Sequence, residues 1–144
     1  MFRELAERLL AGGREVSFTA HGVSMTPFIR DAEYVRVRPL QGRPHRGDVV
    51  LCIGALGELM LHRVVRLTST AVITCGDALS TEDQPVPISR VIGRAVAVSG
   101  RRRLHLSFPF GLIVSFRRRL FPRSANCPRI RRAACRLQEI GARV

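Results

Sequence analysis

The alternation of apolar and polar residues predicts a chain built mostly of short β-strands. Residues 34–39 alternate apolar and charged side chains with a period of two, as a half-buried strand does, and residues 15–20 show the same pattern. Short strands that follow one another closely favour a compact, strongly bent β-structure. Four further strands are predicted at 48–53, 59–67, 71–75 and 91–98, with a turn at 54–57 and a polar loop at 76–87.

The chain begins with a different pattern. Residues 2–11 place arginines and glutamates within an apolar repeat, which predicts a short amphipathic helix that ends at Gly12 and Gly13. A chain of 144 residues suffices for one domain with its own core and is too short for two ordinary ones. We therefore predict a single mainly β domain over residues 1–100 and a separate tail over residues 101–144.

Charge separates these two parts. Residues 1–100 carry 12 arginines and 10 acidic residues, a net charge of +2, whereas residues 101–144 carry 12 arginines and one acid, a net charge of +11. A basic tail of this kind suits an anionic membrane surface or a nucleic acid, and it is also compatible with a solvated extension. The chain has one tyrosine and no tryptophan, and it contains no DNA-reading motif, so nucleic acid is the less favoured partner.

The tail is predicted to be interfacial or helical, with a basic helix at 127–140, and it contains the best candidate for a membrane-spanning segment, residues 104–116. This segment is shorter than the roughly 18 residues a membrane-spanning helix needs, and Pro109 and Gly111 interrupt it. Arginine triplets on both sides favour a segment that lies in the membrane interface, although packing against the β-domain is the alternative. The N-terminal pattern does not resemble a secretory signal peptide. We therefore expect a cytoplasmic protein, or one peripheral to the cytoplasmic face of the membrane.

A serine turn is the strongest candidate for chemistry. Ser24 lies in the sequence His-Gly-Val-Ser-Met-Thr-Pro-Phe, residues 21–28. A serine hydroxyl becomes a good nucleophile only when a base takes its proton. The chain contains no lysine, and arginine, with a pKa above about 12, cannot act as that base. If Ser24 is a nucleophile, its base must be a histidine.

Four histidines are available, and His62 is the best placed. His45 lies in a loop that is expected to be exposed, and His105 lies in the tail. His21 is three residues before Ser24 and could line the site, but a local turn rarely aligns two such side chains. His62 lies in the middle of an apolar strand, where a polar residue needs a partner. Taken alone, it is better interpreted as a hydrogen-bonded core histidine or as one that faces solvent on the polar side of the strand.

The order of the motifs resembles the superfamily of signal peptidases and self-cleaving repressors. Ser-Met-x-Pro at 24–27 is followed by Arg-Gly-Asp-Val-Val at 46–50, His-Arg-Val-Val at 62–65, and Gly-Asp at 76–77 with a second aspartate at 83. In the ER-type and archaeal-type signal peptidases, a histidine replaces the usual lysine before Arg-Val. The resemblance covers about residues 16–98. It implies the bent catalytic β-domain of that superfamily, a fold that needs neither a cofactor nor a metal.

The resemblance also implies roles for individual residues. Ser24 matches the nucleophile, His62 the general base and Asp83 the acid that orients the histidine. Asp77 either shares that task or structures the loop, and Glu82 is a neighbouring competitor. Supporting positions are Gly22, Met25 and Pro27 of the serine motif.

Two departures qualify the match. Gly22 stands where the family usually has a hydroxyl residue that helps to bind the oxyanion, so backbone N–H groups would have to do so. The N-terminal pattern is also not expected to form the transmembrane anchor of signal peptidases. We therefore predict a serine endopeptidase that cleaves a leader or signal-like peptide. The alternative is a catalytically weak or inactive binding module with the same fold.

Overall fold

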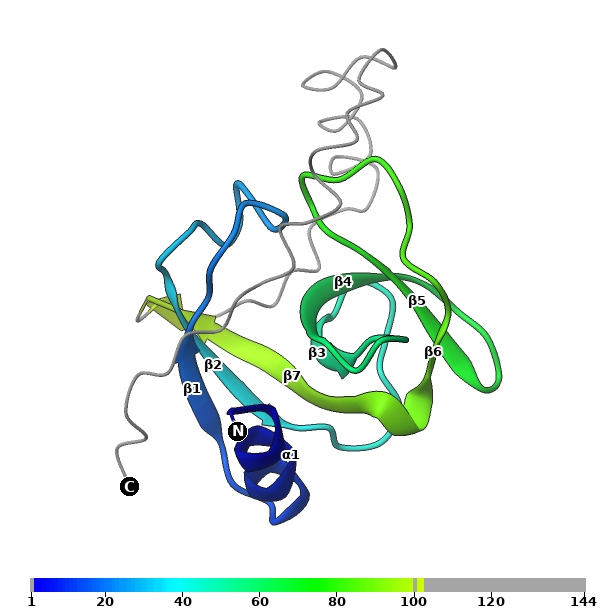
Figure 1. Cartoon of the computed structure of the whole chain (residues 1–144), viewed down its shortest axis with the longest axis horizontal. Helices are drawn as coiled ribbons and strands as arrows, with labels where there is room; N and C mark the ends of the chain where they lie inside the picture. The colour runs from blue at the N-terminus through cyan, green and yellow to red at the C-terminus, as the bar shows by residue number, and fades with distance from the viewer. Residues whose placement is uncertain (1, 100, 103–144) are drawn as a thin grey trace.

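The computed structural model describes residues 2–99 and 101–102, and the rest of the predicted basic tail lies outside the described residues. The described chain is mainly β, with one short helix at its N-terminus (Figure 1). The elements are α1 (Phe2–Ala11), β1 (Val16–Thr19), β2 (Tyr34–Pro39), β3 (Val49–Ile53), β4 (Leu59–Leu67), β5 (Ala71–Cys75), β6 (Val86–Pro87), a 3₁₀ turn (Ile88–Arg90), β7 (Val91–Val98) and β8 (Arg101–Arg102).

All the described strands belong to one antiparallel sheet. Its order is β1-β2-β7-β3-β4-β5-β6, and β8 adds to β7. The sheet curls strongly, and Figure 1 shows β3 and β4 turned nearly end-on while β7 runs across the molecule. Register shifts in the β2–β7, β3–β7 and β4–β5 pairs contribute to this bending, because a bulge increases local twist. The curl encloses apolar side chains on both faces of the central strands.

Helix α1 packs against the sheet with one apolar stripe. Ala6 and Leu10, four residues apart, are buried, and the ring of Phe2 meets that of Phe18 edge to face with centroids 5.6 Å apart. The helix ends where the sequence predicts, because Gly13 adopts a φ of +80°, a conformation that favours glycine.

Strand β4 separates the two main apolar clusters. Since successive side chains of a strand point to opposite faces, Leu59 and Leu61 join the cluster that contains α1. Val64 points the other way, into a second cluster with Val50 and Val72. His62 and Arg63, consecutive in the same strand, therefore project from opposite faces of β4. The two side chains therefore have different partners: His62 contacts Ser24, and Arg63 contacts Asp77.

The expected mainly β class and N-terminal helix are confirmed, and each predicted strand is present within one residue at either end. One assignment was wrong: the predicted loop at 76–87 ends in the short strand β6. Two residues that contain a proline give no periodicity for a pattern to detect. The predicted interfacial segment and tail helix lie outside the described residues.

No helix among residues 2–99 is both long and apolar enough to cross a membrane. The apolar segment that the sequence singles out, 104–116, lies outside the described residues.

Candidate active site

Ser24 lies in the loop that joins β1 to β2. Hydrogen bonds between Ala20 and the far side of the loop close its base, with Ala20 N–H donating to Glu33 and Ala20 C=O accepting from Ala32. Met25 and Ile29 anchor the loop in the apolar cluster that contains α1. The burial of these two side chains holds the backbone of Ser24 in place. Met25 thus has a packing role, while Pro27 is exposed and follows a cis peptide bond.

Gly22 shapes the approach to Ser24. Its φ of +106° is one that other residues rarely adopt, and its N–H donates to Asp31 Oδ1 at 2.8 Å. This hydrogen bond lowers the pKa of Asp31, and the nearby His21, 3.5 Å from the same oxygen, acts in the same direction. The Gly22–Asp31 contact ties the start of the serine turn to the other side of its loop.

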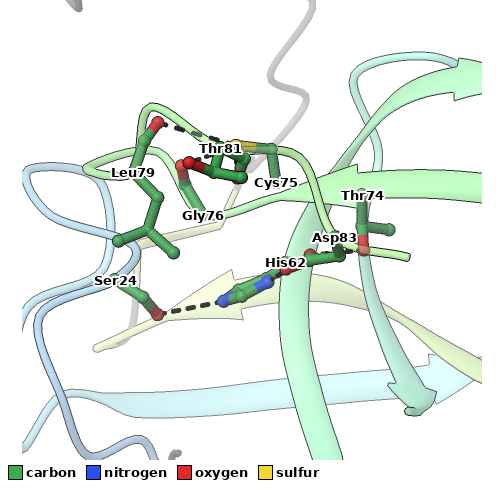
Figure 2. Close-up of polar contacts among 8 residues, drawn as sticks. All are labelled: Ser24, His62, Thr74, Cys75, Gly76, Leu79, Thr81 and Asp83. Atoms are coloured by element: carbon green, nitrogen blue, oxygen red, sulfur yellow. Dashed lines mark hydrogen bonds and ion pairs between the residues drawn. The ribbon is translucent and has the colours of Figure 1, made fainter. Parts of the chain in front are cut away.

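His62 reaches the serine from β4. Its Nε2 lies 3.1 Å from Ser24 Oγ, across 38 residues of sequence (Figure 2). The side chain is 12% exposed, so the imidazole is largely shielded and still within reach of a substrate. The histidine that the sequence singled out is therefore in hydrogen-bonding distance of the candidate nucleophile.

Asp83 completes the chain of contacts. His62 Nδ1 lies 2.6 Å from Asp83 Oδ2, and the carboxylate is 18% exposed. An ionised carboxylate only accepts hydrogen bonds, so Nδ1 carries the proton, and in the neutral imidazole Nε2 is left as the acceptor. Ser24 Oγ–H can then donate to Nε2. Figure 2 shows the three side chains in one line.

The loop at 76–83 holds the serine turn as well as the acid. Ala78 N–H donates to the carbonyl oxygen of Ser24 at 2.8 Å. A Cβ at Gly76 would lie 2.6 Å from that same oxygen, closer than a side chain can approach. Glycine is therefore required at 76 if the loop is to pack against the backbone of Ser24.

Asp77 is placed away from the histidine and pairs with Arg63. Arg63 Nε and Nη2 donate to the two carboxylate oxygens of Asp77, both at 2.7 Å. Arg63 Nη1 donates to Gly47 O at 2.8 Å, and the guanidinium lies 5.3 Å from the centre of the Phe28 ring. Arg63 thus joins three loops, those that carry Phe28, Gly47 and Asp77. Sequence reasoning missed this role, although an arginine within an apolar strand was a possible signal.

The remaining candidates occupy other positions. Glu82 is exposed and pairs with Arg66. His45 is 76% exposed, near Asp48 and Arg94, and His105 lies outside the described residues.

Cys52 is a poor rival nucleophile, because burial first, and then the charges of Asp83 and Glu58, raise the pKa of its thiol to about 12. Residues 2–99 contain no cluster of side chains suited to hold a metal ion.

The N–H of Ser24 is a backbone donor that could serve an oxyanion. Among the described residues, the N–H of Ser24 has no hydrogen-bond partner. Gly22 has no side chain to supply a second donor, as the sequence indicates. A negatively charged oxygen that forms next to Ser24 Oγ would therefore meet a backbone donor and no hydroxyl from position 22.

A small hollow adjoins the serine. It measures about 10 Å³ and is lined by Ala20, Met25, Ile29 and Leu61 together with His21, Gly22 and Ser24. A larger hollow of about 460 Å³ shares none of these lining residues, and its Arg43 already donates to the carbonyls of Thr68 and Ser69. The chemistry is thus associated with the smaller hollow, whose walls are mostly apolar apart from His21 and Ser24.

A scan of the chain against protein-family models finds no match, and a search of curated proteins finds none.

Proposed function

We propose that this protein is a serine endopeptidase with Ser24 as nucleophile, His62 as general base and Asp83 as the orienting acid. The observation that carries the proposal is the continuous contact from Ser24 Oγ to His62 Nε2 and from His62 Nδ1 to Asp83. These three side chains come from two loops and one strand, far apart in sequence. An inert core histidine needs partners too, but it has no reason to link a serine in a partly exposed turn to a carboxylate.

In the proposed reaction, Ser24 Oγ attacks the carbonyl carbon of a peptide bond. The hydroxyl proton passes to His62 Nε2, and the carbonyl electron pair moves onto the oxygen, which faces the N–H of Ser24. Asp83 accepts the Nδ1 hydrogen bond and stabilises the imidazolium. When the tetrahedral intermediate collapses, the C–N bond breaks and the leaving amine takes the proton from Nε2. A water molecule then hydrolyses the acyl-serine ester through the same proton transfers.

The resemblance in motif order to histidine-containing signal peptidases supports a leader or signal-like peptide as substrate. The hollow beside Ser24 has room for about one water molecule, so in this structure it suits a small side chain such as that of alanine. Its lining is mostly apolar and includes no Arg, Asp or Glu side chain, which disfavours a charged side chain there. We infer that cleavage follows a small, uncharged residue.

One observation favours a second candidate, a binding module that holds such peptides without efficient turnover. Gly22 removes the side-chain donor that the related peptidases use, and loss of one oxyanion donor can lower the rate by about 10²- to 10³-fold. Substitution of Gly22 by serine discriminates between the two candidates. If the Gly22→Ser variant turns over peptide faster than the wild type, the protein is a weak enzyme. The backbone of this variant is strained, because position 22 has a φ of +106°.

Digestion of a defined peptide library, read by mass spectrometry, tests the proposed function. The wild type should cut after small residues, and Ser24→Ala should leave every peptide intact. Peptides that bind both proteins without being cut would support the binding module. Equal cleavage by both proteins would refute the proposal, because the activity would not depend on Ser24.

We also propose that the basic tail brings the domain to an anionic membrane surface. This rests on sequence alone, since residues 103–144 lie outside the described residues. Each arginine near such a surface contributes about 1 kcal/mol, and the effect decays over about 8 Å at physiological salt. Co-sedimentation with anionic and neutral vesicles should show salt-sensitive binding to the anionic ones, lost on truncation after Arg103. Binding that is indifferent to lipid charge would contradict this.

A further inference from the structure

We propose that Thr74 is a positioning residue for the reaction, because it fixes the carboxylate that orients His62. The inference rests on the proposed function and adds a fourth side chain to the three that carry it. Thr74 Oγ1–H donates to Asp83 Oδ2 at 2.7 Å, and this is the same oxygen that accepts from His62 Nδ1 at 2.6 Å (Figure 2).

The position of Thr74 follows from the register of two strands. Val64 in β4 faces Thr74 in β5, so Thr74 lies on the same face of the sheet as His62, two residues before Val64. Its neighbours on that face belong to the apolar cluster of Val64 and Val72. Thr74 is itself 0% exposed. A buried hydroxyl needs a hydrogen-bond partner, and the partner of Thr74 is Asp83.

Thr74 holds the main chain of Asp83 as well. Asp83 N–H donates to the carbonyl oxygen of Thr74 at 2.8 Å, so one residue of β5 fixes both the backbone and the side chain of the acid. Eight residues lie between Thr74 and Asp83: the chain leaves β5 after Cys75 and comes back to the strand at Asp83. This double contact decides where the loop comes back to the sheet.

Neighbouring Cys75 supports the same loop from the other face. Its Sγ lies 3.2 Å from Thr81 O, 3.4 Å from Gly76 O and 3.6 Å from Leu79 O, and Figure 2 shows these groups gathered around the sulfur. The thiol has one proton and can donate to only one carbonyl at a time. None of these carbonyls belongs to Asp83, so the direct link from β5 to the acid is Thr74.

The contact has a mechanical consequence for His62. An Asp carboxylate rotates easily about its terminal torsion, and a single hydrogen bond from an imidazole would leave that rotation poorly restrained. With two donors on Oδ2, the carboxylate presents one oxygen in a fixed direction. The imidazole then keeps its proton on Nδ1 and directs Nε2 toward Ser24 Oγ.

The test compares Thr74→Val, which keeps the shape and removes the hydroxyl, with Thr74→Ser, which keeps the hydroxyl. Proton NMR detects the Nδ1–H of His62 as a low-field resonance without any need for a substrate, and ¹⁵N labelling of histidine identifies it. Wild type and Thr74→Ser should show the resonance, and Thr74→Val should broaden or lose it. Peptide hydrolysis should fall about 10- to 100-fold in kcat in Thr74→Val, with KM little changed.

These readouts separate the inference from the proposed function. If the wild type cuts no peptide but the resonance behaves as described, the proposed function fails and the positioning role stands. If Thr74→Val hydrolyses peptides and shows the resonance like Thr74→Ser, the positioning role is overturned and the peptidase stands. Absence of the resonance from the folded wild type would also overturn the inference.

Thr74→Ala provides a second variant that lacks the hydroxyl, and circular dichroism monitors the fold of each. A folded Thr74→Ala protein should behave as Thr74→Val does. Loss of the fold in both variants, while Thr74→Ser stays folded, would show that the hydroxyl serves stability and would overturn a positioning role.

Discussion

Two consecutive residues of β4 hold two aspartates of one loop, and the two pairs differ in burial and in chemistry. His62 contacts Asp83 with side chains that are 12% and 18% exposed, next to the hydroxyl of Ser24. Arg63 contacts Asp77 with side chains that are 1% and 2% exposed. The alternation of the strand sends the first pair toward the serine and the second into the junction of three loops.

The difference separates a proton-transfer pair from a structural one. Imidazole gains and loses a proton near neutral pH, and its second nitrogen remains available to the serine. Guanidinium stays charged, and its donors are used by Asp77 and Gly47, so it can move no proton. We therefore expect damage to the first pair to remove activity, and damage to the second to remove stability.

The largest effect should follow substitution in the first pair. Asp83→Asn keeps the size of the side chain but can donate to Nδ1, which favours the wrong tautomer of His62. We expect kcat for peptide hydrolysis to fall by about 10⁴-fold, as it should in His62→Ala and Ser24→Ala, with the circular dichroism spectrum unchanged. Retained activity in His62→Ala would overturn the histidine base and make His21 the next candidate.

Substitution in the second pair, Arg63 and Asp77, should lower the stability of the fold. Removal of one partner of a buried ion pair leaves the other charge uncompensated, which destabilises a protein by about 3–5 kcal/mol. We expect a loss of this size in the free energy of unfolding for Asp77→Asn, measured by urea denaturation. Arg66→Ala is the matched control, because Arg66 pairs with Glu82 from the same strand to the same loop, but at the surface, and should lose less than about 1 kcal/mol. Similar losses in both variants would contradict the contrast in burial.

The pH dependence of activity sharpens the comparison further. A histidine base works only when neutral, and histidine side chains ordinarily titrate near pH 6.5. We expect kcat/KM to rise about tenfold per pH unit from acid and to level off near neutral pH. Arg66→Ala should show the same profile. The account fails if no such limb exists between roughly pH 5 and 8 while the chemical step limits the rate.

The smallest effect concerns the exposed contact between Asp31 and Gly22. The hydrogen bond from Gly22 N–H lowers the pKa of Asp31 in the folded state below its ordinary value of 3.8. A lowered carboxyl pKa stabilises the fold above the unfolded-state pKa, and this contribution is lost as pH falls through the folded-state value. The difference in Tm between wild type and Asp31→Ala should therefore be present at pH 7 and shrink below about pH 4. A difference that grows in acid would contradict this sign.

Most of the fold could be predicted from the sequence because strands with one buried face alternate visibly. Tyr34–Pro39 and Leu59–Leu67 begin and end where the pattern predicts. Strands β6 and β8 could not be found, since two-residue strands exist only through pairing with a neighbour. The curl of the sheet, which depends on bulges and register, is equally invisible in a pattern of apolar residues.

Part of the candidate site could be predicted from the sequence. Motif order indicated Ser24, His62 and Asp83, and the structure brings these three together. The sequence left Asp77 open as an alternative, because either aspartate of a loop can reach the strand before it. Only the path of the loop assigns Asp77 to Arg63. The contact of Thr74 with Asp83 likewise depends on how that loop returns to β5.

Covalent labelling tests the central claim most directly, because it needs no knowledge of the substrate. A serine-directed phosphonate probe reacts with an activated hydroxyl and spares ordinary serines, and peptide mapping by mass spectrometry locates the modified residue. The account predicts labelling of the wild type at Ser24, none in Ser24→Ala, and strongly slowed labelling in His62→Ala, while Arg66→Ala reacts like the wild type. No labelling of the folded wild type, or equally fast labelling of Ser24 in His62→Ala, would contradict the claim that His62 activates this serine.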